Sequence, residues 1–129
     1  MRTYALDRIE SLYPLEDTQW FMQADFHPDL YFQHIVGVSL PEDQDLQRIR
    51  FKTTALRAKY IATKPLHPSQ KRIVSNDKYS IFEIEVIPNI ELIQIFLSLC
   101  KDLEVLEPLP LRKRIAAHLL SASQKYLQE

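Results

Sequence analysis

The stretch of residues 79–108 constrains the fold most, because it contains a strand, a helix and a second strand with almost no connecting residues. Within residues 79–87, Phe82, Ile84 and Val86 alternate with acidic side chains. This alternation is typical of a strand with one buried and one solvated face. The remainder of the chain must therefore provide a sheet for this strand and a layer that covers one face.

A helix over residues 90–100 follows, since Pro88 ends the strand and Asn89 can accept a hydrogen bond from an unpaired amide of the first helical turn. The polar residues of this helix form one narrow stripe, so most of its circumference is apolar. Such a helix must be covered on more than one side, and we expect Phe96 to be buried. Residues 103–107 predict the returning strand.

Further elements flank this stretch on both sides. Residues 46–54 alternate between apolar and basic side chains and predict a half-buried strand. Residues 55–63 predict a short helix, and residues 70–75 predict another strand that a tight turn joins to residue 79. After Pro108, residues 110–127 predict a long last helix. Its apolar stripe at helical spacing consists of Leu111, Ile115, Leu119, Ala122 and Tyr126.

The resulting order, β-α-β-β-α-β and a further helix, predicts an α+β fold. It is the order of the ferredoxin-like plait, an antiparallel sheet with two helices on one face. In that topology the first and third strands are neighbours. We therefore expect the basic side chains Arg48, Arg50 and Lys52 to lie beside Glu83 and Glu85 on the open face of the sheet.

The N-terminal third is organised differently. Residues 2–9 alternate and predict a short strand. Residues 13–45 form a connector, within which residues 28–36 predict a helix that Gly37 ends. The connector is rich in large rings: Trp20, Phe21, Phe26, Tyr31 and Phe32. Such rings are enriched where two proteins meet, so they indicate either a homodimer interface or packing against the chain's own sheet.

Bulk properties exclude several classes of protein. The 129 residues suffice for about one domain, and a net charge of −1 provides no global field that would attract nucleic acid or an acidic membrane. A single cysteine excludes an internal disulfide and is typical of the cytoplasm. One glycine excludes glycine-rich phosphate-binding loops. We find neither a signal peptide nor an apolar run of the ~20 residues that a membrane span needs, so no membrane partner is expected.

Several spaced fragments together resemble the C-terminal part of bacterial WYL-domain transcriptional regulators. In order along the chain, the fragments are RTYALDRI at residues 2–9, Phe26 with the predicted helix ending at Val36-Gly37-Val38, LHPSQ at 66–70, NIELIQIFLSLCKDLEVLEP at 89–108, and Leu111-Arg112. One departure is Cys100-Lys101, where the family commonly has a glycine that ends the helix.

The resemblance implies a division into three parts. Residues 1–12 are similar to the final strand of a truncated WYL domain, an Sm-like barrel. Residues 13–45 are the connector, and residues 46–129 are the ferredoxin-like C-terminal extension. In such regulators a helix-turn-helix binds DNA, whereas the WYL domain and its extension sense an effector and dimerise. We therefore expect a non-catalytic, cytoplasmic regulatory region that reaches DNA only through a missing N-terminal domain.

The resemblance also implies a nucleotide or nucleic-acid effector bound through the WYL region. Arg2 and Arg8 share one face of the predicted strand, and arginines in the WYL core are thought to bind such effectors, so this pair is the first ligand candidate. A second candidate group lies at a proline-bounded turn and consists of His67, Gln70, Lys71 and Arg72. The alternative for this group is a solvated turn.

A third basic group, Arg112, Lys113 and Arg114, lies in the first turn of the last helix. Cations are unfavourable there, because the positive end of the helix dipole repels them. They need an anionic neighbour, which is either an anionic ligand or the carboxylates of Glu104 and Glu107.

No pattern predicts catalysis, a metal site or a cofactor. Cys100 has no catalytic surroundings, and we expect it to pack as a small apolar side chain. Glu104 and Glu107 are expected on opposite faces of a strand, where they are poorly placed as an acid and base pair. None of the histidines has metal-binding spacing to a neighbour. These histidines are His27, His34, His67 and His118.

Two functions besides the regulator stay open. One is a free-standing ferredoxin-like module that binds small molecules. The other is a small enzyme on the same fold, for which the fold itself is no evidence.

Overall fold

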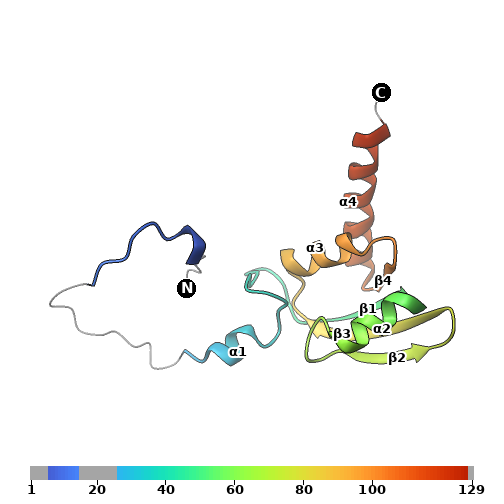
Figure 1. Ribbon diagram of the computed structural model, residues 1–129, viewed down its shortest axis with the longest axis horizontal. Coiled ribbons are helices and arrows are strands. Elements are labelled where there is room, and N and C mark those ends of the chain that lie inside the picture. Colours follow the sequence, from blue (N-terminus) through green and yellow to red (C-terminus); the bar gives the residue numbers. More distant parts are fainter. Residues whose placement is uncertain (1–5, 15–25, 128–129) are drawn as a thin grey trace.

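A computed structural model describes residues 6–14 and 26–127 of the chain. Four strands form one antiparallel sheet in the order β2-β3-β1-β4. The strands are β1 (Gln47–Thr54), β2 (Lys71–Ser75), β3 (Tyr79–Val86) and β4 (Leu103–Glu107). Helix α2 (Ala55–Thr63) joins β1 to β2, and α3 (Ile90–Ser98) joins β3 to β4, as Figure 1 shows. This order and topology confirm the predicted α+β fold of the ferredoxin-like type.

The core lies on one face of the sheet, under the helices. Phe96 of α3 is 1% exposed, which confirms its predicted burial. Its ring centroid lies 5.5 Å from that of Phe51, which in turn stacks on Phe82 at 5.7 Å. The other buried apolar side chains of this cluster are Ile49, Ala58, Ile61, Ile84, Val86, Leu92, Ile93, Leu103, Val105, Leu111 and Ile115.

The open face of the sheet carries the predicted charged pairs. In the register between β1 and β3, Arg48 lies opposite Glu85 and Arg50 lies opposite Glu83, so the expected neighbours are confirmed for both arginines. Lys52 instead lies opposite Ile81. Strand β2 is an edge strand, and all of its residues are exposed.

A bulge in the pairing of β1 with β4 corrects one expectation. The register shifts between Arg50 and Phe51, so that Arg50 lies opposite Glu107 and Lys52 lies opposite Glu104. Both glutamates therefore pair with residues of the open face, and they do not lie on opposite faces. The simple rule that every second residue shares a face fails here, because a bulge inserts one unpaired residue.

Helix α3 ends earlier than predicted, at Ser98, without a glycine. Leu99 follows with a φ of −103°, and the amide of Asp102 donates to the Leu99 carbonyl at 2.8 Å to close the turn into β4. Cys100 lies in this turn and is exposed, so its expected packing in the core is wrong. The helix ends before the thiol can reach the covered face.

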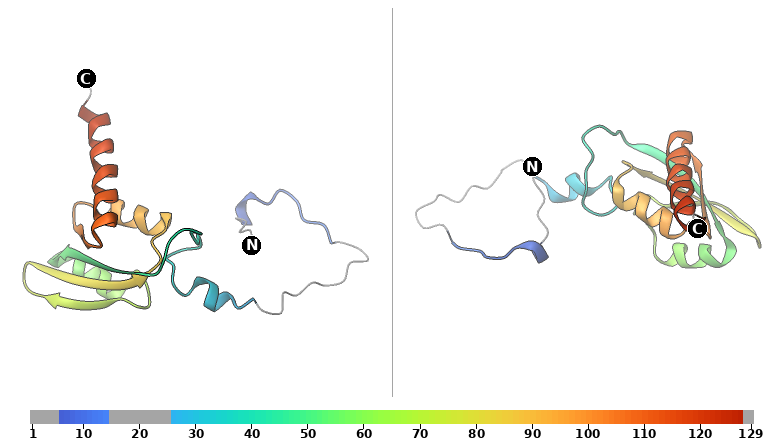
Figure 2. Two further views of the ribbon diagram at one scale, coloured as in Figure 1. Left: turned by 180° about the vertical axis from the view of Figure 1, so that it is seen from behind. Right: turned by 90° about the horizontal axis from the view of Figure 1, so that it is seen from above.

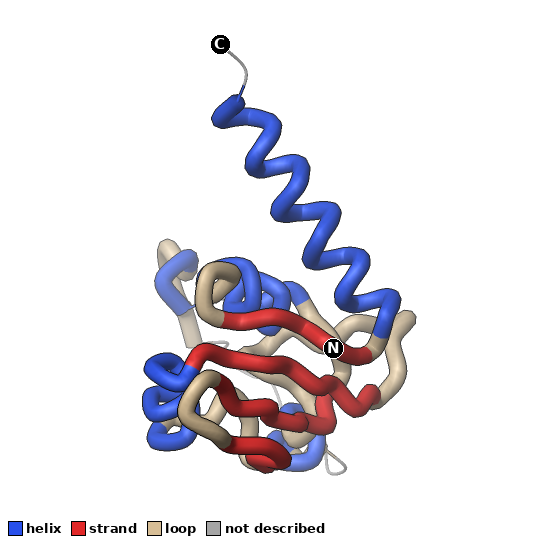
Figure 3. Tube along the Cα trace, turned by 90° about the vertical axis from the view of Figure 1, so that its right-hand side faces the viewer, coloured by secondary structure: helices blue, strands red, loops and turns tan. Residues whose placement is uncertain are grey.

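Helix α4 (Leu109–Leu127) begins against the sheet and then leaves it, as Figures 1 and 2 show. Leu111 and Ile115 are its only buried residues in the described part. The rest of the predicted stripe is exposed, because the helix extends beyond the edge of the core (Figure 3).

The predicted helix over residues 28–36 is shorter in the structure. Helix α1 (Pro28–Phe32) ends where the carbonyl groups of Gln33, His34 and Val36 begin to accept hydrogen bonds from the domain. A continued helix cannot satisfy donors from different elements, because all of its carbonyl groups point along one axis.

The predicted strand over residues 2–9 lies partly outside the described residues. Its described half contains the 3₁₀ helix η1 (Leu6–Arg8) and is not a strand. No described strand lies beside these residues, so their backbone groups lack the ladder partners that a strand requires. The aromatic residues Trp20 and Phe21 also lie outside the described part, whereas Tyr31 contacts Phe26 and Phe32 with ring centroids 5.5 Å and 4.8 Å apart.

Candidate regulatory site

His67 lies in the turn between α2 and β2, is buried, and bonds to the connector. Its Nε2 is 3.0 Å from the carbonyl oxygen of Gln33, and its Nδ1 accepts from the amide of Ser69 at 3.2 Å. Because a carbonyl only accepts, Nε2 carries a proton. Nδ1, which accepts from the Ser69 amide and also lies 2.7 Å from the Ser69 hydroxyl oxygen, then carries none in the neutral ring. Burial lowers the pKa of His67 below its ordinary value of 6.5, which favours the same neutral form.

Gln70, at the other end of this turn, also forms hydrogen bonds to backbone groups of the domain. Its Oε1 accepts from the amide of Leu66 at 3.0 Å, and its Nε2 donates to the carbonyl of Ile61 at 3.0 Å. The structure thus engages both His67 and Gln70 inside the domain.

Asn89 caps α3, as predicted, and also holds the connector. Its Oδ1 accepts from the amide of Leu92 at 3.0 Å. Its Nδ2 donates to the carbonyl groups of Val36 at 2.7 Å and Ser39 at 2.9 Å. One side chain therefore joins the start of a core helix to a segment about 50 residues earlier in the chain.

Glu91 binds the next part of the connector. Its Oε1 accepts from the Ser39 hydroxyl at 2.6 Å, the Ser39 amide at 3.1 Å and the Val38 amide at 3.4 Å. Burial by itself would raise the pKa of Glu91, but these hydrogen bonds outweigh it and the pKa is lowered. The contact requires Gly37, whose φ is +79° and whose missing Cβ would lie 2.9 Å from Glu91 Cγ.

We name this arrangement the connector anchor: the side chains of His67, Asn89 and Glu91 with the backbone of residues 33–39. The amide of Ile87 adds a hydrogen bond of 2.7 Å to the carbonyl of His34. Sequence reasoning selected His67 and Asn89 but missed Glu91 and Ser39 as anchor residues. The available signal was the single glycine of the chain, at position 37.

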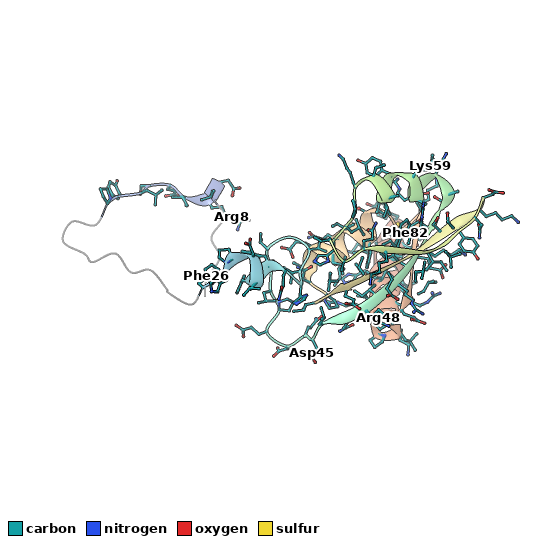
Figure 4. All side chains as sticks on the ribbon, turned by 90° about the horizontal axis from the view of Figure 1, so that it is seen from below. Arg8, Phe26, Asp45, Arg48, Lys59 and Phe82 are labelled. Carbon is teal, nitrogen blue, oxygen red and sulfur yellow. The ribbon has the colours of Figure 1, made fainter. Side chains whose placement is uncertain are left out.

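The basic candidates occupy separate places. Lys71 and Arg72 are exposed on the edge strand β2. Arg8 is exposed on the N-terminal arm, and Figure 4 shows it far from Arg48 on the sheet. Arg2 lies outside the described residues, so no shared face with Arg8 is described.

For Arg112, the first cation of α4, the anionic neighbour is a carboxylate of the chain itself. Arg112 Nη2 forms an ion pair with Glu104 Oε1 at 2.8 Å, and Arg112 Nη1 donates to the carbonyl of Val105 at 2.9 Å. Lys113 and Arg114 are exposed.

The arginines of the open sheet face are paired as well. Arg50 Nε lies 2.8 Å from Glu83 Oε2, and Arg50 Nη1 lies 3.4 Å from Glu107 Oε2. Arg48 Nη2 lies 3.4 Å from Glu85 Oε1. The hydrogen bond between Glu83 and Arg50 raises the pKa of the guanidinium and lowers that of the carboxyl, so both stay charged. This face is a compensated network of charges.

Among residues 6–14 and 26–127, no group of three or more His, Cys, Asp and Glu side chains is arranged to hold a metal ion. None of the described helices combines the length and the apolar character needed to cross a membrane.

Comparison with known protein families agrees with the fold and with the sequence fragments. The family model of the WCX domain matches residues 45–122, which is more than half of the chain. A comparison with curated proteins finds no match. The matched range contains the whole sheet, α2, α3 and most of α4. The chain therefore belongs to the WCX domain family, the C-terminal extension of WYL-type regulators.

Proposed function

We propose that this chain is the effector-sensing and dimerising region of a bacterial, cytoplasmic helix-turn-helix regulator of the WYL type, and that it is not an enzyme. The observation that carries the proposal is the connector anchor. A sensing domain must pass a change in its own state to the chain that precedes it. Directional hydrogen bonds from His67, Asn89 and Glu91 provide such a coupling, because a shift in α3 or in the turn before β2 displaces residues 33–39.

Helix α4 supports the dimerising part of the proposal. Leu120, Tyr126 and Leu127 are 62%, 90% and 77% exposed, respectively, on a helix that extends beyond the core. Apolar side chains grouped on a projecting helix favour burial against a second helix. The partner proposed is a second copy of this chain, because regulators that read two-fold operators need two identical chains at a fixed spacing.

Sedimentation velocity of the chain at tens of micromolar tests this surface. We expect a dimer that the double variant Leu120→Glu/Leu127→Glu converts to a monomer. The control Ser121→Glu/Gln124→Glu adds the same charge to exposed polar positions of α4 and should stay dimeric. A monomeric wild-type chain would show that α4 does not provide the dimer interface.

A fusion tests the regulator itself. The chain is fused to the C-terminus of a helix-turn-helix domain. That domain binds its two-fold operator only as a dimer and cannot dimerise alone. We expect operator repression by the fusion and its loss with Leu120→Glu/Leu127→Glu. Repression that is equal for both fusions would contradict the proposal.

A free-standing small-molecule-binding module is the second candidate, and a cavity at one end of the sheet favours it. The cavity holds about 470 Å³ and is lined by residues of β1, β3 and β4 and of two turns. Ligand binding with no dimer and no repression by the fusion would favour this module over the regulator.

A further inference from the structure

The cavity at the end of the sheet gathers three lysines from three separate segments. Its volume of about 470 Å³ is within the range of about 300–1,000 Å³ typical of small-molecule sites. Lys52 lies on β1, Lys78 in the turn before β3, and Lys101 in the turn before β4. These segments meet because the C-terminal end of β1 pairs with the N-terminal ends of both β3 and β4.

A tyrosine ring lines the same cavity. Tyr79 is the first residue of β3 and is half-buried, and Lys52 Nζ lies 4.7 Å from the centroid of its ring. The ring thus orients one ammonium group through a cation–π contact. It also presents an aromatic surface on which a planar group can stack.

The positive charge of the cavity is not compensated by its own carboxylates. Asp102 and Glu104 also line it, but Asp102 Oδ2 pairs with Arg57 Nη2 at 3.1 Å and Glu104 Oε1 pairs with Arg112 Nη2 at 2.8 Å. Within residues 6–14 and 26–127, no ion pair involves any of the three cavity lysines, Lys52, Lys78 and Lys101. Three like charges around one cavity repel one another, and an anion placed among them relieves that repulsion.

We propose that this cavity binds a small phosphorylated compound. The three ammonium groups surround the phosphate, and the Tyr79 ring contacts a planar part of the ligand. A phosphate monoester carries about −1.5 to −2 charges near neutral pH, which matches several lysines better than a single carboxylate does. Lysine binds phosphate as a point charge, so no forked arginine is needed. All of its lining residues lie within residues 45–122, the range that the WCX family model matches.

Calorimetric titration of the whole chain at low ionic strength tests the site, with inorganic pyrophosphate and adenosine diphosphate as probes. We expect both to bind, and the nucleotide to bind more tightly because it adds a ring contact. The triple variant Lys52→Gln/Lys78→Gln/Lys101→Gln should lose about tenfold or more in affinity for both. Raising the salt from about 50 to about 500 mM should also weaken binding to the wild type.

The matched control is Lys59→Gln/Lys113→Gln/Lys125→Gln, which removes the same charge from exposed positions outside the cavity. It should keep the wild-type affinity. Equal losses of affinity in both triple variants would show that the probes bind through the overall charge of the chain and not in the cavity, which would contradict the proposal. Absence of binding of either probe to the wild type would also overturn it.

Single variants separate folding from binding and test the ring. Lys78→Gln and Lys101→Gln change exposed turn residues, so both should fold, as far-UV circular dichroism would report, and each should weaken pyrophosphate binding. Tyr79→Leu should reduce the affinity for adenosine diphosphate to that for pyrophosphate. An unchanged preference for the nucleotide in Tyr79→Leu would exclude the ring contact.

Discussion

Single polar side chains hold the connector on the domain, and one of them is His67, whose pKa burial lowers below its ordinary value of 6.5. Its neutral ring donates from Nε2 to Gln33 and accepts at Nδ1 from the amide of Ser69. A second ring proton, on Nδ1, would displace the hydrogen bond from the Ser69 amide and would leave only the Ser69 hydroxyl oxygen, 2.7 Å away, as its acceptor.

We therefore predict that the free energy of unfolding falls as the pH drops below 6.5, the ordinary pKa of a histidine. The pKa of His67 is lowered in the folded state, so between that pKa and 6.5 the unfolded chain binds a proton that the folded chain does not. The contribution of His67 is complete above 6.5 and is lost as the pH falls through the folded pKa. Urea unfolding from pH 7.5 to 5 measures it.

The variant His67→Gln should lack this part of the pH dependence, whereas His118→Gln, at an exposed position of α4, should retain it. The carboxyl groups with lowered pKa, Glu83 and Glu91, titrate below their ordinary value of 4.5 and so outside this window. Identical pH profiles for His67→Gln and the wild type would refute the role of His67.

Phe96 is one of the three largest fully buried side chains in the described part of the chain. It is 1% exposed and contacts the Phe51 ring across the interface between α3 and the sheet. Phe96→Ala should lower the free energy of unfolding by about 3–5 kcal/mol, because it leaves a cavity as well as removing apolar contact. Ile90→Ala on the same helix, where the side chain is 49% exposed, should cost much less. Comparable losses for the two variants in urea unfolding would contradict the packing described.

Among the elements, the segment of residues 33–39 depends on a backbone conformation that only glycine adopts freely. Gly37→Ala should strain the left-handed backbone by about 1–2 kcal/mol and push Glu91 away from its hydrogen bonds. We predict faster hydrogen exchange at the amide of Ile87, which bonds to His34 of this segment. Amides in the centre of β1 should exchange as in the wild type.

The control for this variant is Val38→Ala, which shortens an exposed side chain and keeps the amide that donates to Glu91. It should leave the exchange of Ile87 unchanged. Normal protection of Ile87 in Gly37→Ala would show that the anchor does not need the glycine.

Helix α4 differs from α3 in what covers it. In α3, Leu92, Ile93 and Phe96 are buried, whereas α4 buries only Leu111 and Ile115 among its described residues. The uncovered turns of α4 are therefore the element on which the proposed dimer depends. Their exposure also means that truncating the last turns should affect association more than folding.

For the whole molecule, charge predicts how the chain behaves toward DNA. The net charge is −1, and four of the seven described arginines pair with carboxylates: Arg48, Arg50, Arg57 and Arg112. We predict that the chain alone binds duplex DNA weakly and without sequence preference, with a dissociation constant of about 10⁻⁴ M or weaker at physiological salt. Fluorescence anisotropy with two unrelated duplexes measures this. Tight binding to one duplex only would contradict it.

Within residues 46–129, the sequence by itself determined the elements, their order and the register of β1 with β3. Alternation along residues 79–87, the cap at Asn89 and the opposite charges on the first and third strands are local patterns, and the sheet pairs Arg50 with Glu83 as they predict. Such patterns suffice because the period of a strand and the needs of a helix end depend on neighbouring residues.

Only the tertiary structure decided which polar residues are buried and which apolar ones are not. His67 and Gln70 read as ligand candidates, but contacts with Gln33 and Ile61 engage them inside the fold. The bulge that puts Glu107 beside Arg50, the uncovered end of α4, and the meeting of the three cavity lysines likewise arise between segments distant in sequence. Periodicity carries no information about such meetings, because they depend on how the elements pack and on where the turns end.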